Sequence, residues 1–206
     1  EFSIVNDTTG IKIIATKSKT NEDTLSSYGV AKPLLSTKSQ GLEDKNMQDM
    51  LDQADRYIAS KQFGQGAQVL QQILASTQNE FYKQEAIYKL GETYLLMGQY
   101  DGLYYTSAYE IFDEFVKLYP DNFRTPDALL KSAEAKVDAN QQFEAINTYL
   151  KIYNTVPDLE TKRDALKKMA ELYKKVGQVE KAIETYLSYL RNFKTDQNMI
   201  NGEVGY

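Results

Sequence analysis

Apolar residues recur at helical spacing from Met47 onward, and the pattern repeats along the chain. Each copy predicts two helices joined by a turn, because its apolar residues fall on one face of each helix. The clearest copy consists of Ile87, Leu90, Gly91, Tyr94, Ala108, Phe112 and Pro120. Two further copies consist of Leu129, Ser132, Ala133, Lys136, Ala145, Tyr149 and Pro157, and of Leu166, Met169, Ala170, Tyr173, Ala182 and Tyr186. A weaker copy precedes them at Met50, Gln53, Ala54, Tyr57, Gly66 and Leu70. The chain therefore predicts four helix pairs.

Small residues and prolines predict how these helices cross and where they end. The position that is small in every copy holds Ala54, Gly91, Ala133 and Ala170. A small side chain lets a neighbouring helix cross closely. The turns within pairs hold Gly98, Asn140 and Gly177, which we expect to adopt positive φ. Pro120 and Pro157 are expected to end the second helices of their pairs.

This pattern resembles the tetratricopeptide repeat (TPR), a helix–turn–helix unit that stacks into a right-handed solenoid. The resemblance covers residues 47–196 and implies an all-α fold of about four repeats. It also implies a scaffold or adaptor that presents a surface to protein partners and catalyses no reaction itself.

The connector at residues 119–129 suggests a cellular setting. It reads Tyr-Pro-Asp followed, after four residues, by Pro-Asp-Ala-Leu. Such connectors are similar to those of bacterial envelope TPR proteins of the BamD and Tol–Pal cell-division coordinator types. The resemblance implies a cell-envelope assembly in the periplasm or at the outer-membrane periphery. Whether a signal peptide or a lipid anchor preceded Glu1 stays open. The alternative is a soluble cytoplasmic chaperone or regulator that sequesters one peptide segment.

Composition narrows the chemistry further. The 206 residues include no cysteine and no histidine, which removes thiol nucleophiles, imidazole-based triads and the usual zinc ligands. The net charge of −5 argues against nucleic acid as a partner. No apolar run approaches the ~20 residues that a membrane-spanning helix needs. We therefore expect no enzyme, no catalytic residue, no metal and no cofactor.

The exposed stripe of each first helix is the candidate partner-binding groove. In a TPR the fifth, ninth and twelfth positions face this groove. The ninth position is acidic in all four copies: Asp55, Glu92, Glu134 and Glu171. The fifth and twelfth positions are apolar in the first three copies: Leu51, Ile58, Tyr88, Leu95, Leu130 and Val137. An apolar groove with an acidic column would favour a partner segment bearing Lys or Arg.

A simpler interpretation of the acidic column stays open. Glutamate at this position is common on solvated helices, and Glu171 would then pair with Lys174 or Lys175.

The second copy carries five extra residues between its helices, which creates a tyrosine-rich loop. Its candidate interface residues are Tyr100, Leu103, Tyr104 and Tyr105. The alternative is that this loop packs on its own repeat.

The two ends of the chain differ from the repeats. Residues 1–46 are rich in Ser and Thr, and two β-favouring runs, residues 3–5 and 11–15, flank a turn-rich stretch at residues 6–10. This segment is either a flexible tether or a short hairpin that docks on the repeats or on a partner. Residues 197–206 form a polar tail without a clear capping helix, so either the tail folds back or a partner docks there.

Hydrogen exchange tests how the first segment is held. Ordering a residue costs about 1–2 kcal/mol of backbone entropy, and this segment has little apolar surface to offset that cost. We expect residues 4–15 to exchange rapidly in the isolated protein and to exchange slowly once the assembly is added. Strong protection of residues 4–15 without a partner would show that the chain itself provides the docking surface.

Overall fold

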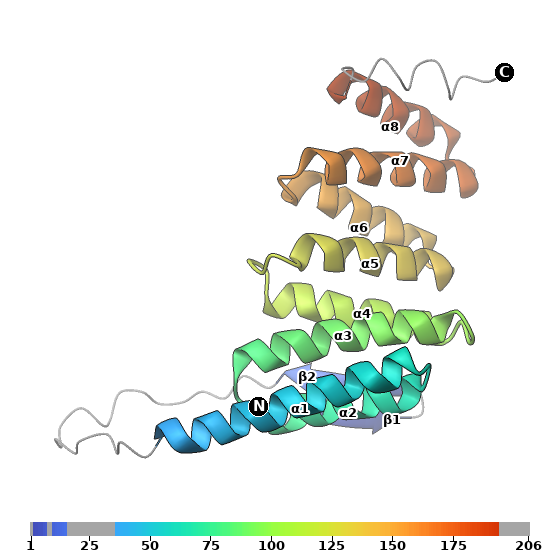
Figure 1. The fold of residues 1–206 in the computed structure, drawn as a ribbon. Coiled ribbons are helices and arrows are strands. Elements are labelled where there is room, and N and C mark those ends of the chain that lie inside the picture. The colour runs from blue at the N-terminus through green and yellow to red at the C-terminus, as the bar shows by residue number, and fades with distance from the viewer. Residues whose placement is uncertain (1, 8–9, 16–35, 194–206) are drawn as a thin grey trace. The chain divides into compact units, whose positions relative to one another are not determined.

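The structure, a computed structural model, describes residues 2–7, 10–15 and 36–193 (Figure 1). Within those ranges the chain forms eight helices and one two-stranded sheet. It divides into two compact units, an N-terminal unit (Glu1–Met97) and a C-terminal unit (Gly98–Tyr206). The last predicted stretch, residues 197–206, lies outside the described residues.

The N-terminal unit contains a hairpin, one of the two alternatives that the sequence leaves open for the first residues. Strand β1 (Phe2–Asp7) runs antiparallel to β2 (Gly10–Ala15), with Phe2 opposite Ala15 and Asp7 opposite Gly10. The strands therefore extend into residues 6–10, which the sequence assigns to the turn.

Three helices complete the N-terminal unit: α1 (Ser36–Ala59), α2 (Phe63–Ser76) and α3 (Glu80–Gly98). The predicted boundary between residues 46 and 47 falls inside α1, so helical structure begins earlier than the apolar repeat indicates. A tertiary contact accompanies this extension. The carboxylate of Asp44 accepts a hydrogen bond from Asn79 at 2.9 Å, and its backbone carbonyl accepts one from the Tyr82 hydroxyl at 2.8 Å.

The core of the N-terminal unit follows the repeat pattern. It buries Ala54, Leu70, Ile73, Ile87 and Leu90 almost completely. A Cβ added to Gly66 of α2 would lie 2.8 Å from Cγ1 of Ile58 in α1. A larger residue at this position would therefore push the two helices apart.

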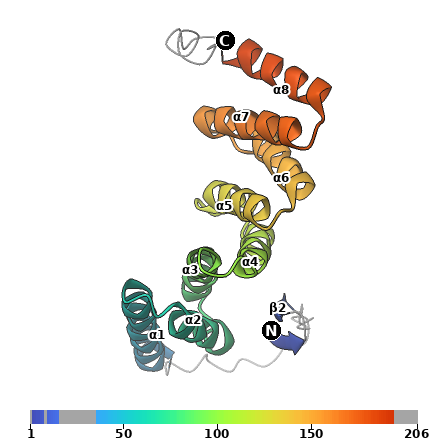
Figure 2. The same ribbon diagram turned by 90° about the vertical axis from the view of Figure 1, so that its right-hand side faces the viewer.

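The C-terminal unit consists of five helices that pack in chain order: α4 (Tyr104–Leu118), α5 (Thr125–Asp138), α6 (Gln142–Thr155), α7 (Leu159–Lys175) and α8 (Val179–Asn192). In this unit α5 and α7 lie on one side, and α4, α6 and α8 lie on the other (Figure 2). The sequence pattern makes α5 and α7 the first helices of the third and fourth pairs.

The turns are confirmed with one correction. Asn140 (φ 64°) and Gly177 (φ 78°) adopt positive φ, and Lys61 (φ 59°) does so in the first pair, where the sequence offers no glycine signal. Gly98 instead is the last residue of α3, and its own φ is not positive. It is small for another reason: a Cβ there would lie 2.6 Å from the ring of Tyr105.

A polar cluster joins α4, α5 and α6 where the third copy departs from the repeat pattern. Ser132 donates to one carboxylate oxygen of Asp113 at 2.6 Å, and the ammonium of Lys136 contacts the other at 2.8 Å. Lys136 is buried and also donates to the Thr148 hydroxyl at 3.0 Å. The two residues that break the pattern, Ser132 and Lys136, therefore share one partner.

Matched phenylalanines test the assignment of the core. Phe112 is 0% exposed and Phe123 is 83% exposed. We expect Phe112→Ala to lower the free energy of unfolding by about 3–5 kcal/mol, because it leaves a cavity. Phe123→Ala should cost less than about 1 kcal/mol, since it removes only surface contacts such as the one with Arg124. Urea unfolding of both variants measures the difference, and equal losses would mean that the helical phase is wrong.

Candidate binding site

The predicted groove is only partly exposed in the N-terminal unit. Leu51 is 4% exposed and Tyr88 is 7% exposed, so these two fifth-position residues are buried rather than available to a partner. Helical periodicity predicts which residues share one face of a helix, but it does not predict which neighbouring elements bury that face. The twelfth-position residues Ile58 and Leu95 are half-buried.

The acidic column is partly neutralised by lysines of the following repeat. Asp55 of α1 pairs with Lys89 of α3 at 2.7 Å. Glu134 of α5 pairs with Lys168 of α7. Each lysine lies 34 residues after its acidic partner, which is one repeat further along the chain.

Glu171 behaves differently from those two acids. It is exposed, and in the part of the chain that the structure describes it makes no ion pair with Lys174 or Lys175. The expected pairing of Glu171 with Lys174 or Lys175 is therefore not seen, although its exposure fits a solvated helix residue. Asp55 and Glu134 form ion pairs that the sequence did not predict. Glu92, the fourth acid, is half-buried on α3.

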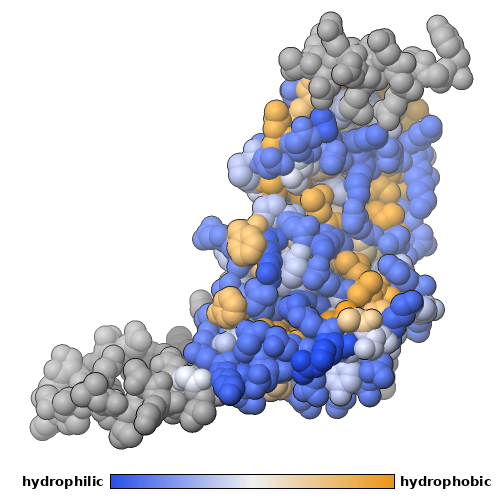
Figure 3. Space-filling model, viewed as in Figure 1, coloured by the Kyte–Doolittle hydropathy of each residue, from blue (hydrophilic) through white to orange (hydrophobic). Residues whose placement is uncertain are grey.

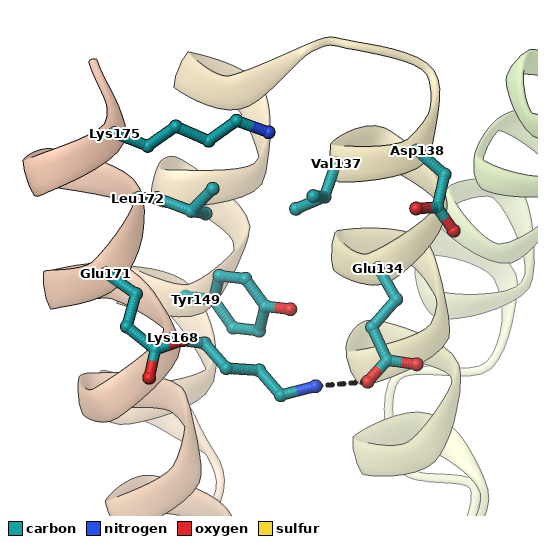
Figure 4. A pocket seen from close by; sticks show the side chains of 8 residues that line it. All are labelled: Glu134, Val137, Asp138, Tyr149, Lys168, Glu171, Leu172 and Lys175. Atoms are coloured by element: carbon teal, nitrogen blue, oxygen red, sulfur yellow. Dashed lines mark hydrogen bonds and ion pairs between the residues drawn. The ribbon is translucent and has the colours of Figure 1, made fainter.

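In the C-terminal unit the predicted stripe borders an open pocket of about 470 Å³ (Figure 4). Its lining comes from three helices: Glu134, Val137 and Asp138 of α5, Tyr149 of α6, and Lys168, Glu171, Leu172 and Lys175 of α7. Three predicted groove residues, Glu134, Val137 and Glu171, are thus brought together. Leu130, half-buried on α5, is not part of the lining.

Figure 3 shows the side of the C-terminal unit that α5 and α7 form. Hydrophilic side chains cover most of this side, and small hydrophobic patches lie between them. The pocket has the same mixed character, since Val137 and Leu172 accompany five charged side chains.

Tyr149 is the residue that distinguishes this pocket. It is 1% exposed and stands at the core position that Leu70 and Phe112 occupy in the preceding copies. Its hydroxyl points into the space between α5 and α7 (Figure 4). Among the described residues, none forms a hydrogen bond with this hydroxyl, which is not one of the fully buried polar atoms and therefore opens onto the pocket.

Burial and neighbouring charges both favour the neutral, protonated form of Tyr149. Burial is the main cause that raises the pKa of Tyr149 far above its ordinary value, and the negative charges of Glu134, Asp138 and Glu171 raise it further. Burial also raises the pKa of Asp138, with Glu134 adding to the effect and Lys175 opposing it. The pocket therefore has excess negative potential.

The sequence pattern misses five of the eight residues that line this pocket. Asp138, Lys168, Leu172 and Lys175 fall outside the three groove positions, and Tyr149 counts there as a core residue. One available signal is the lysine that recurs one residue after the fifth position, at Lys89, Lys131 and Lys168. The other is the tyrosine at the position that holds Leu70 and Phe112 in the two preceding copies.

Some residues of the tyrosine-rich loop are exposed, as an interface requires, and others pack on the loop's own repeat. Tyr100 and Leu103 are exposed, whereas Tyr104 and Tyr105 are half-buried in the first turn of α4. Tyr105 packs against Gly98, as expected for a loop that packs on its own repeat. The exposed pair Tyr100 and Leu103 stays a predicted interface.

The described residues offer neither a metal site nor a membrane-spanning helix. They contain no group of three or more Asp, Glu, His or Cys side chains that could hold a metal ion. None of their helices combines the length and the apolar character that a membrane span requires.

Comparison with known proteins agrees with the helix pairs described above. Residues 85–122, 127–158 and 164–195 match the model of the tetratricopeptide repeat family. The chain is therefore a tetratricopeptide repeat protein. None of the curated proteins compared with it matches its sequence.

Solved structures with a similar fold include two named groups. A structure titled as the putative kinesin light chain of "Podosopora anserina", with nearly identical TPR-like repeats, superimposes with a TM-score of 0.56 at 18% identity, covering 73% of this chain and 77% of that one. MamA of Desulfovibrio magneticus RS-1 superimposes with a TM-score of 0.53 at 18% identity, covering 72% and 76%. At this identity the likeness shows the fold alone. TPR repeats are protein-interaction scaffolds and generally carry no enzymatic activity.

Tyr149→Phe tests whether the buried hydroxyl lacks a partner. We expect the variant to change the free energy of unfolding at pH 7 by less than about 0.5 kcal/mol, because no hydrogen bond within the described chain is lost. Tyr94→Phe is the matched control. It removes a hydrogen bond from Gln71 to the Tyr94 hydroxyl of 2.9 Å and should cost about 0.5–1.5 kcal/mol.

The same variant predicts a change in pH dependence. A raised pKa contributes stability below the unfolded-state pKa near 10, and that stability is lost as pH rises toward the folded-state pKa. Tyr149→Phe should therefore lose less stability than the wild type between pH 9 and pH 11, in urea unfolding at both values. Parallel curves for the two proteins would contradict the raised pKa.

Proposed function

We propose that the protein is a non-enzymatic scaffold that binds a segment of a partner protein on the side formed by α5 and α7. The observation that supports this most is the open pocket between these helices, where the otherwise buried Tyr149 presents a hydroxyl that makes no hydrogen bond with a described residue. The pocket combines a small apolar surface with convergent polar and charged groups, and concave sites that hold precisely placed polar groups commonly bind ligands.

The exposed stripe supports the same side. Half-buried Val137 gives apolar contact area, and Asp138 and Glu171 give acceptors that no described residue engages in an ion pair. Tyr100 and Leu103 offer a second exposed contact surface for a further partner. A scaffold with two contact surfaces suits an assembly of several proteins.

We further propose that this assembly belongs to a bacterial cell envelope, at the periplasm or the outer-membrane periphery. Support comes from the connector at residues 119–129 and its similarity to those of BamD-type and Tol–Pal coordinator proteins. Fractionation of the native cells tests the location. Recovery with the envelope supports the proposal, and recovery in the cytoplasmic fraction favours the chaperone or regulator alternative.

Site-specific photo-cross-linking tests the binding surface. We expect benzoylphenylalanine at position 137 to yield a discrete cross-linked partner, because this position lines the pocket. The matched control is position 147, where Asn147 is exposed on α6 and does not line the pocket. Cross-links at 147 that equal those at 137 would contradict a partner bound between α5 and α7.

A further inference from the structure

The charges of the pocket point to the kind of side chain that it receives. Its lining holds three acids, Glu134, Asp138 and Glu171, and two lysines, Lys168 and Lys175. The pocket therefore carries one net negative charge. One added cation would balance it, whereas an added anion would increase the imbalance.

The ion pair between Glu134 and Lys168 leaves the other acids available. Neither Asp138 nor Glu171 makes a hydrogen bond or an ion pair with any residue that the structure describes. They belong to different helices, α5 and α7, on opposite sides of the pocket (Figure 4). A ligand that satisfies both must carry donors that point in different directions.

The Tyr149 hydroxyl supplies a third acceptor from α6. It is an unsatisfied polar group on a side chain that is 1% exposed, and it points into the same space. A phenol that keeps its proton can donate one hydrogen bond and accept another. Three acceptors from three helices thus surround one space.

Apolar groups complete the fit. Half-buried Val137 lies beside the acceptors on α5, and the mostly buried Leu172 and the ring of Tyr149 form the floor behind them. They suit the methylene stem of a long basic side chain, which packs on apolar surface while its charged end reaches polar partners. A metal ion would leave this apolar surface without a role.

We propose that this pocket binds an arginine side chain of the partner segment, with its guanidinium between Asp138, the Tyr149 hydroxyl and Glu171. Arginine fits better than lysine because its guanidinium carries five N–H donors in a fixed plane, which can reach acceptors on several sides. Lysine has three donors on one strongly hydrated ammonium. This inference rests on the proposed function, since it identifies the partner chemistry of the same surface.

Titration of the full chain with small probes tests the proposal. The probe is Nα-acetyl-arginine methylamide, and the readout is the NMR methyl signals of Val137 and Leu172. Nα-acetyl-lysine methylamide and Nα-acetyl-norleucine methylamide are the comparison probes. We expect the arginine probe to shift both signals in a saturable way with a Kd on the order of millimolar, the lysine probe to bind more weakly, and the norleucine probe to cause no saturable shift.

Charge-neutralising variants locate the binding. Asp138→Asn and Glu171→Gln should each weaken arginine binding by about tenfold, and Tyr149→Phe by about threefold. Glu184→Gln removes the same charge from an exposed residue of α8 that does not line the pocket, so it should leave the Kd unchanged. Far-UV circular dichroism confirms that each variant is folded.

Several results would overturn the inference. One is a saturable methyl shift with the norleucine probe equal to that with the arginine probe. A second is a lower Kd for the lysine probe than for the arginine probe. A third is an equal rise in the Kd of the arginine probe in Glu184→Gln and Glu171→Gln. The outcome is separate from that of cross-linking. If position 137 captures a partner and the arginine probe does not bind, the arginine inference fails and the scaffold proposal stands. If the probe binds and no partner cross-links, the scaffold proposal fails instead.

Discussion

The helices of this protein cross where almost no side chain separates them, and the rest of each unit depends on that close approach. Ala54, Ala133 and Ala170 occupy the crossing positions and are completely buried. A larger residue would have to displace a neighbouring helix, because packed interiors leave little free volume. The crossing fixes the faces that the first helices turn outward. In the C-terminal unit it therefore fixes which side chains of α5 and α7 face the pocket.

The proposed binding site of the C-terminal unit depends on one exception to this apolar packing. The position that holds Leu70 and Phe112 in earlier copies holds Tyr149 in the third, so a core residue places a hydroxyl at the pocket. A second exception, the cluster of Asp113, Ser132 and Lys136, is satisfied entirely within the protein. The cluster bonds within the protein, whereas the Tyr149 hydroxyl opens onto the pocket, and this difference is why we propose a recognition role for the hydroxyl alone.

Much of the fold could be predicted from the sequence, because helix periodicity, small crossing residues and terminal prolines are local signals. Pro120 and Pro157 follow α4 and α6, as predicted, and Asn140 and Gly177 adopt the predicted turn conformation. The early start of α1 is not a local signal. Asp44 contacts Asn79 and the Tyr82 hydroxyl, which are distant in sequence.

The binding site could be predicted only in part. Repeat positions identified Glu134, Val137 and Glu171, because these residues recur on one helix face. They also included Leu51 and Tyr88, which are buried, since periodicity cannot reveal which neighbour covers a face. Asp138, Tyr149 and Lys175 meet only when three helices pack, so no spacing within one helix predicts them. A single groove through all four copies remains a prediction.

The most direct measurement of the central claim is an experimental structure of the chain bound to its physiological partner. The account predicts that a segment of the partner lies on the side formed by α5 and α7, with a basic side chain that contacts Asp138, Tyr149 and Glu171. A partner bound on the side of α4, α6 and α8, or one that places an acidic or apolar side chain in the pocket, would contradict it.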